Sequence, residues 1–484
     1  MLCKSFEKCG RLPRLIFKVS SYSRQRAGKT VNCILAPAEK NSSYSSFKIM
    51  ILSKHNIISR IKDSDEYFIV NLLSGNADVL TESMYKELQN GTYQNTEELI
   101  NKGYLVDERS EAKLYKEKYL DFIDNRENDE VQIFFIPWYS CNFACSYCYQ
   151  DEYESVKQKL TPEIISSFFT YVGQNFADRK KYITIFGGEP LLAGSYYKEN
   201  IEMVISEATA RNIDIAIVTN GYHIAEYIDI LRKGKIREVQ VTLDGTADFH
   251  DKRRYLKDHS PTFDKISGGI DLLLSNHIPV NLRMVVDREN ISGLPALARY
   301  AIDKGWTKSS FFKTQLGRNY ELHHCQKSSI RLYNRLNLYE DLYRLINESP
   351  EILEFHKPAF SVSKFLFENG ELPEPLFDSC PACKTEWAFD YTGHIYSCTA
   401  TVGKAGEELG TFYPEISIND NAICDWQERD VLAIPECKNC PVQLACGGGC
   451  GSVAKNQEGS ITKPDCRPVK ELLELGISLY GKDE

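Results

Sequence analysis

Short apolar segments alternate with amphipathic segments along the middle of this 484-residue chain. Six apolar segments have the length of strands and lie at 131–136, 182–186, 213–218, 238–243, 280–286 and 310–313. Helical spacing of apolar residues predicts helices at 161–177, 195–211, 223–233, 262–276 and 293–304. A helix between each pair of successive strands indicates parallel strands joined by right-handed crossovers. The pattern therefore predicts an α/β fold with a partial, TIM-like (β/α)6 barrel over residues 128–313.

Residues 50–126 follow a different pattern, with shorter elements. Strands are predicted at 51–53, 67–70 and 104–106, turn residues at 74–76, and short helices at 83–88 and 96–100. Strands on both sides of a helix pair predict an N-terminal winged-helix-like domain. Its simplest role would be a solvent cover for the barrel.

Residues 1–49 are rich in Lys, Arg and Ser and contain only two acidic residues, Glu7 and Glu39. No helix or strand period is present in them. A transit peptide, a basic disordered arm and translated sequence upstream of the true start are the three interpretations. We favour the third, because Met50 begins the first predicted strand, and expect a disordered or non-native extension.

The composition excludes several classes of protein. A net charge of −9 argues against a nucleic-acid partner, and no apolar run reaches the ~18 residues needed to span a bilayer, so no membrane partner is expected. The 16 cysteines are too many for core packing alone. Metal ligation in a reducing compartment, the cytoplasm, explains them better than disulfides do.

Three of these cysteines, Cys141, Cys145 and Cys148, follow the first barrel strand with the spacing Cys-x3-Cys-x2-Cys. Three thiolates can hold three irons of a 4Fe–4S cluster and leave the fourth iron open. S-adenosylmethionine can chelate that iron through its amino and carboxylate groups. Structural zinc is the alternative, but such sites usually pair two Cys-x2-Cys units, and this stretch has one.

Glycine and polar residues follow the later barrel strands, where such barrels carry their chemistry. These residues are Gly187, Gly188, Glu189 and Pro190 after the second strand, Thr219, Asn220 and Gly221 after the third, and Thr242 and Asp244 at the fourth. The glycines would let the backbone approach the methionine part of the cofactor, and Glu189 could accept from its ammonium group. Thr242 and Asp244 could accept from its ribose hydroxyls. Asn220, Arg253, Arg254 and Arg283 could also face this pocket.

A second cysteine array lies in residues 376–484, after a predicted helical connector at 314–375. It comprises Cys380, Cys383 and Cys398, then Cys437, Cys440, Cys446, Cys450 and Cys466. Cys-x2-Cys pairs occur here, so zinc is a stronger alternative than at Cys141.

The run Cys141-x3-Cys145-x-Tyr147-Cys148, followed by Gly187-Gly188-Glu189-Pro190, resembles the signature of the radical S-adenosylmethionine superfamily. The second array resembles the SPASM domain of such enzymes. The resemblance implies that Tyr147 borders the adenine, and that a flavodoxin or ferredoxin-type protein supplies electrons. It also implies two auxiliary 4Fe–4S clusters, three clusters in all. Their implied ligands are Cys380, Cys383, Cys398 and Cys450 for one, and Cys437, Cys440, Cys446 and Cys466 for the other.

Two branches of this class fit the chain. Peptide maturases generate a 5′-deoxyadenosyl radical and link side chains of a ribosomally made precursor by thioether or carbon–carbon bonds. Anaerobic sulfatase maturases oxidise Cys or Ser to formylglycine, with an Asp base directly after the middle SPASM cysteine, where this chain has Thr399. Residues 50–126 also resemble the domain to which a leader peptide adds as a strand. We therefore expect a cross-linking maturase.

A third possibility is an iron–sulfur redox-sensing regulator that binds DNA through the winged-helix-like domain. The second helix of that domain bears Glu97 and Glu98, with only Lys102 to meet phosphates. This interpretation also leaves the Gly-Gly-Glu-Pro motif unexplained.

Overall fold

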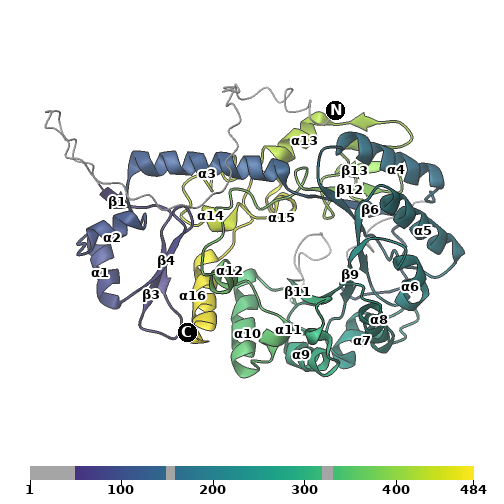
Figure 1. Cartoon of the computed structure of the whole chain (residues 1–484), viewed down its shortest axis with the longest axis horizontal. Coiled ribbons are helices and arrows are strands. Elements are labelled where there is room, and N and C mark those ends of the chain that lie inside the picture. Colours follow the sequence, from purple (N-terminus) through teal and green to yellow (C-terminus); the bar gives the residue numbers. More distant parts are fainter. Residues whose placement is uncertain (1–49, 149–157, 319–330, 484) are drawn as a thin grey trace, which may run out of the picture.

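The structure, a computed structural model, describes residues 50–148, 158–318 and 331–483 (Figure 1). The expectation for residues 1–49 lies outside them, as does part of the predicted connector at 319–330. Figure 1 shows the barrel on one side of the molecule and a small N-terminal sheet on the other, with the long helix α3 (Glu108–Asn128) running from one toward the other.

Six parallel strands form the barrel and are neighbours in the order of the sequence. They are β6 (Val131–Ile136), β7 (Lys181–Ile185), β8 (Asp214–Thr219), β9 (Ile236–Thr242), β10 (Val280–Val286) and β11 (Phe312–Arg318). Their connecting helices are α4 (Pro162–Asn175), α5 (Ser195–Ala210), α6 (Ile224–Leu231), α7 (Ala247–Arg253), α8 (Phe263–Ser275) and α9 (Leu294–Asp303). The predicted partial barrel is confirmed. The sequence pattern missed α7, a short helix that ends in basic residues.

Alternate residues of the barrel strands face the helices and the barrel interior. Ile133 and Phe135 of β6 belong to the main core, and the Phe135 ring packs 4.5 Å from that of Phe168 in α4. The opposite face is partly polar, since Gln132 Nε2 donates to Thr184 Oγ1 of the next strand at 2.9 Å. The interior therefore offers hydrogen-bonding side chains to a ligand.

The cysteine-rich region extends the barrel sheet, a feature that was not predicted. Strand β12 (Glu386–Asp390) pairs in parallel with β6, from Glu386 opposite Gln132 to Asp390 opposite Ile136. The sheet continues through β13 (His394–Tyr396), β14 (Gly410–Thr411) and β15 (Ser417–Ile418), all antiparallel. Pairing with β12 covers the edge of β6 that a partial barrel would leave open.

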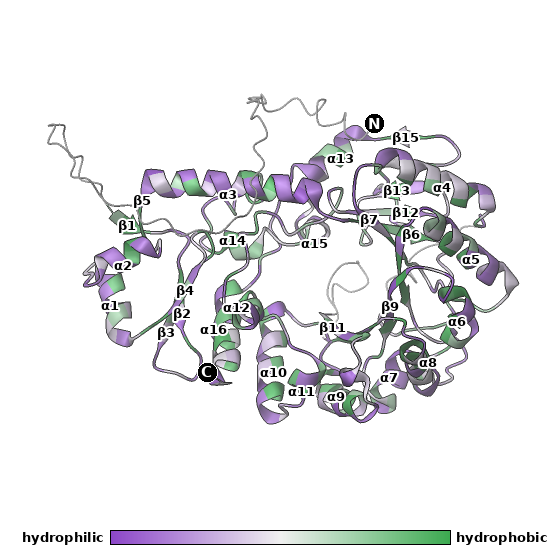
Figure 2. Ribbon diagram, in the orientation of Figure 1, coloured by the Kyte–Doolittle hydropathy of each residue, from purple (hydrophilic) through white to green (hydrophobic). Residues whose placement is uncertain are grey.

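The N-terminal region contains two small sheets. Strands β2 (Ile57–Arg60), β3 (Tyr67–Asn71) and β4 (Asn76–Leu80) form one, and β1 (Met50–Leu52) with β5 (Leu105–Asp107) forms the other. Helices α1 (Glu82–Asn90) and α2 (Thr96–Asn101) lie between β4 and β5. Strand β2 and helix α3 were not predicted. Figure 2 shows α3 as largely hydrophilic along its length, so its apolar positions form only a weak pattern.

The N-terminal and cysteine-rich regions share one apolar core. Phe68 and Val70 of β3 pack in it with Leu473 of α16 (Val469–Tyr480), and the same core contains Cys437 and Cys446. The other helices of this half are α10 (Arg335–Glu348), α11 (Ile352–Phe355), α12 (Ser363–Asn369), α13 (Asp420–Gln427), α14 (Gln443–Cys446) and α15 (Gly451–Glu458). The sheet that precedes the barrel thus rests on the second cysteine array. In the described part of the chain, no helix has the length and apolar character needed to cross a membrane.

Candidate active site

The loop with Cys141, Cys145 and Cys148 follows β6 and is anchored on two sides. On one side, Gly188 N donates to Trp138 O at 3.2 Å and Glu189 N donates to Ser140 O at 2.9 Å. On the other side, Ala144 N donates to Tyr255 O and Ser146 N donates to Arg253 O, both at 2.9 Å. The loops after β7 and α7 therefore fix the main chain around the three cysteines.

The three thiols are half-buried and lie near one another. Burial, with a contribution from the Glu189 carboxylate and smaller ones from Cys145 and Cys148, raises the pKa of Cys141 to about 12. Two buried donors beside them, Asn142 Nδ2 and Arg254 Nε, have no partner within the described residues. Thiols that can ligate iron, next to donors left unsatisfied, fit a cluster with an anionic ligand.

Gly187 and Gly188 are required by the packing of their own loop. A Cβ at Gly188 would lie 2.2 Å from Ser140 O, and one at Gly187 would lie 2.7 Å from Trp138 O. These distances are too short for any side chain. The glycines thus let the second loop pack directly against the backbone that leads into Cys141, a role beyond the cofactor approach that we predicted.

Glu189 is buried, and both oxygens of its carboxylate accept hydrogen bonds from the protein. One oxygen accepts from Thr219 Oγ1 at 2.6 Å and from Leu191 N at 2.8 Å, and the other accepts from Asn220 N at 2.6 Å. Burial raises its pKa to about 7. Asn220 Nδ2 in turn donates to Asn142 Oδ1 at 2.8 Å. Glu189 and Asn220 thus connect the end of β8 to the cysteine loop. Buried Pro190 follows it.

Asp244 follows strand β9 of the barrel. It is fully buried, and its carboxylate accepts from Val285 N at 3.0 Å and Arg253 Nε at 3.3 Å. Arg253 also pairs with both oxygens of Asp287 at 2.8 and 3.0 Å. Thr242 is buried and lies opposite Arg283 in the sheet. Direct bonds from Asp244 to a ribose, as predicted, would compete with these partners.

Tyr147, the aromatic residue predicted to border an adenine, is held by two arginines. Arg254 Nη1 donates to its hydroxyl at 2.7 Å, and the Arg253 guanidinium lies 4.9 Å from its ring centroid. Burial raises the pKa of Tyr147 well above its usual range. The sequence indicated both arginines only as possible pocket residues, since two adjacent arginines are not a specific signal.

The eight remaining predicted ligands fall into two groups. Burial raises the pKa of Cys398 to about 12, and the nearby thiols Cys380 and Cys450 contribute. Burial also raises the pKa of Cys383 well above its usual range, and the nearby thiols Cys398 and Cys380 contribute. Burial raises the pKa of Cys437 to about 11, with contributions from Cys446, Cys440 and Cys466.

Among the described residues, no three His, Cys, Asp or Glu side chains converge closely enough to hold a single metal ion. The assignment of each ligand remains a prediction.

Comparisons with known proteins give the class. Residues 135–301 match the profile of the Radical SAM superfamily. The chain is 30% identical over 371 residues to a cysteine-type anaerobic sulfatase-maturating enzyme of Clostridium novyi, which covers 70% of this chain and 93% of that protein. It is 26% identical over 350 residues to a serine-type anaerobic sulfatase-maturating enzyme of Bacteroides thetaiotaomicron. This match covers 64% of this chain and 80% of that protein.

A solved structure, native anSMEcpe with bound AdoMet and Cp18Cys peptide, has the same fold. The TM-score is 0.57 at 19% identity, covering 73% of this chain and 99% of that one. The fold is that of a radical SAM enzyme. The chain belongs to the peptide-modifying family of the radical SAM superfamily, which includes the anaerobic sulfatase-maturating enzymes. Its cofactors are therefore S-adenosylmethionine and 4Fe–4S clusters, as predicted.

Proposed function

We propose that this enzyme removes a hydrogen atom from a side chain of a ribosomally made precursor peptide and installs an intramolecular cross-link, either a thioether or a carbon–carbon bond. Cys141, Cys145 and Cys148 would hold the 4Fe–4S cluster, and S-adenosylmethionine bound there would supply the 5′-deoxyadenosyl radical that takes the hydrogen. The auxiliary clusters receive the ligands predicted above. A flavodoxin or ferredoxin-type protein serves as the external electron donor.

The free edge of β4 carries this proposal. Within the described residues, β4 ends its sheet and no strand pairs with its outer edge. The other end of the sheet, β2, packs against α16, where Ser59 of β2 donates to Glu474. An exposed strand edge is a template for a peptide that adds as a further strand. The N-terminal sheet therefore suits capture of a leader peptide, a step that a barrel acting on a short motif would not need.

A groove beside β4 provides side-chain pockets for such a strand. It has a volume of about 140 Å³ and is lined by Val79, Met84, Leu88, Leu99 and Tyr104, among others. Val79 is 54% exposed and Met84 is 37% exposed, so apolar side chains of a peptide would cover apolar surface here.

The charges around this groove favour a basic leader. Asp78, Glu87 and Glu98 line it against one cation, Lys102, which bonds to Asp78 at 2.8 Å and Glu98 at 2.9 Å. The excess of carboxylates would attract Lys or Arg residues that flank apolar anchors in a leader peptide.

Formylglycine formation is the second candidate, favoured by the sulfatase-maturating relatives and by one contact. Thr399 stands where those enzymes carry their Asp, but Glu386 Oε1 accepts from Thr399 N at 3.0 Å and from Thr399 Oγ1 at 3.4 Å. A carboxylate thus lies beside the position that lacks one.

Mass spectrometry of a precursor peptide treated with reduced enzyme and S-adenosylmethionine separates the two candidates. A cross-link lowers the peptide mass by about 2 Da per bond, and conversion of Cys to formylglycine lowers it by about 18 Da. Conversion of Ser also removes about 2 Da, but it leaves an aldehyde that a hydrazide captures. An aldehyde on a peptide without a leader would overturn the proposal.

Substitution at the β4 edge tests the leader site. Val79→Lys places a charge on the apolar edge and should weaken precursor binding about tenfold or more, equivalent to roughly 1.4 kcal/mol. Ile416→Lys is the matched control, because Ile416 is also an exposed apolar residue, at 59%, but is not among the residues that line the groove. If both variants bind the precursor equally well, the leader site does not lie at the β4 edge.

A further inference from the structure

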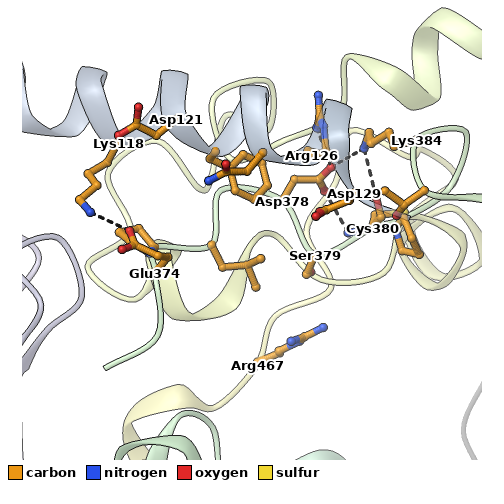
Figure 3. A pocket seen from close by; sticks show the side chains of 16 residues that line it. Lys118, Asp121, Arg126, Asp129, Glu374, Asp378, Ser379, Cys380, Lys384 and Arg467 are labelled. Carbon is orange, nitrogen blue, oxygen red and sulfur yellow. Dashed lines mark hydrogen bonds and ion pairs between the residues drawn. The ribbon is translucent and has the colours of Figure 1, made fainter. Parts of the chain in front are cut away.

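A pocket of about 540 Å³ lies between α3 and the segment that carries Cys380 (Figure 3). Asp378 is the centre of a charged network on its wall, with a side chain only 1% exposed. Its carboxylate accepts from Cys380 N at 2.9 Å and from Arg126 Nη1 of α3 at 3.3 Å, and it pairs with Lys384. One buried carboxylate therefore meets both a predicted cluster ligand and the helix from the N-terminal region.

Lys384 directly follows Cys383, and its side chain is only 4% exposed. Besides Asp378, its ammonium donates to Cys380 O at 3.2 Å and to Arg429 O at 2.9 Å. These three bonds use its three donors. The charge of Lys384 is therefore fixed in place between two predicted ligands of the same cluster.

Three cations meet one carboxylate at this position, while the two other carboxylates nearby bond to neutral donors. Lys384, Arg126 and Arg429, whose Nη1 lies 3.9 Å from Asp378, surround a single carboxylate. Nearby Asp430 accepts from Tyr119 and from the amides of Leu432 and Ala433. Glu386, on the other side of Cys383, accepts from Thr399. A 4Fe–4S cluster on four thiolates would add negative charge beside these cations.

We propose that the fixed positive charge of Lys384 raises the reduction potential of the cluster held by Cys380, Cys383, Cys398 and Cys450. The inference rests on the ligand assignment given under the proposed function. Reduction adds one electron to that cluster, and a fixed, buried cation stabilises the added charge because little solvent screens it. A higher potential makes this cluster a better acceptor for the electron that the peptide must lose after its hydrogen atom has been removed.

The test compares two lysines that each follow a cluster cysteine. Lys384→Gln and Lys438→Gln are prepared in full-length protein in which Cys141, Cys145 and Cys148 are Ala, so that only the auxiliary clusters contribute. Lys438 follows Cys437 but is exposed to solvent. Iron content and potentials from redox titrations followed by electron paramagnetic resonance are the measurements.

We expect Lys384→Gln to lower the potential of one cluster and leave the other unchanged, with about eight irons retained. Lys384→Arg should restore most of the potential, and Lys438→Gln should change neither. Arg126→Gln should give a smaller shift in the same direction, which keeps the test valid if Lys384→Gln loses iron. An unchanged potential in Lys384→Gln and Arg126→Gln, or an equal shift in Lys438→Gln, would overturn the inference. A parent protein without auxiliary iron would instead contradict the ligand assignment.

Discussion

The loop with Cys141, Cys145 and Cys148 is held mainly by main-chain hydrogen bonds, whereas the second cysteine array is held by buried charged side chains. In the first, the amides of Ala144 and Ser146 donate to carbonyls of a neighbouring segment, and the amide of Glu189 in the next loop donates to Ser140 O. In the second, the fully buried Arg429 donates to the carbonyls of Gly448, Gly449, Ile461 and Lys463 at 2.6–3.2 Å. Main-chain bonds therefore anchor the two sides of the first cysteine loop, and a buried guanidinium joins the segments around the second array.

This contrast follows from what surrounds each region. Barrel loops emerge from adjacent parallel strands, so their backbones already lie side by side and can bond directly. The auxiliary loops have little regular structure around them, and one guanidinium with five donors can satisfy several of their carbonyls at once.

Loss of Arg429 should produce the largest effect. Arg429→Met removes every donor to the four carbonyls and leaves Asp378 with less compensation, which should cost about 3–5 kcal/mol of stability. Iron should fall from about twelve toward about four, because segments beside ligands of both auxiliary clusters lose their support. Iron analysis and thermal unfolding measure this. Arg344→Met, at an exposed arginine, is the control. Full retention of iron would show that charge does not hold these loops.

A change of shape should damage the barrel site instead. Gly188→Ala places a methyl group 2.2 Å from Ser140 O, and the forced shift should cost about 1–3 kcal/mol locally. Iron should fall to about eight and 5′-deoxyadenosine formation should stop, while both auxiliary clusters remain. Gly173→Ala in α4 is the matched control, since its Cβ would meet no atom within 4 Å. If Gly188→Ala keeps twelve irons, the close approach is not what shapes the loop.

The barrel could be predicted from the sequence because it rests on local spacing. Strands β6 and β10 have the predicted bounds, and the repeat of apolar residues alone determined them. Contacts between distant segments could not be predicted. The pairing of β12 with β6 and the engagement of Glu189 by the third strand end are examples. Lys384 and Lys438 each follow a cysteine of a Cys-x2-Cys pair, and only the folded chain distinguishes the buried lysine from the exposed one.

The smallest effect that we predict is an opposite response of the two halves to pH. In the barrel, burial raises the pKa of Glu189 from 4.5 to about 7. The folded state then binds the extra proton, so the stability from this group is present at low pH and is lost as pH rises from about 4.5 to about 7. In the N-terminal region, burial lowers the pKa of His55 from 6.5 to about 4. The stability that His55 contributes to the folded state is present above about pH 6.5 and is lost as pH falls toward about 4.

His55 is the more discriminating of the two groups, because both ring nitrogens are buried without a partner in the described residues while the ring stacks 5.4 Å from Tyr115. The N–H groups of a protonated His55 ring would find no acceptor there. Lowering the pH from about 6.5 to about 5.5 should therefore lower the stability of this region by roughly 1 kcal/mol. Hydrogen exchange of β3 amides, corrected for intrinsic rates, should show lower protection at pH 5.5 than at pH 7.5, whereas β7 and β8 amides should show the reverse. His55→Phe keeps the stacking and removes the titration, so it should abolish the change in β3 alone. An unchanged β3 response in that variant would assign the acid sensitivity to another group.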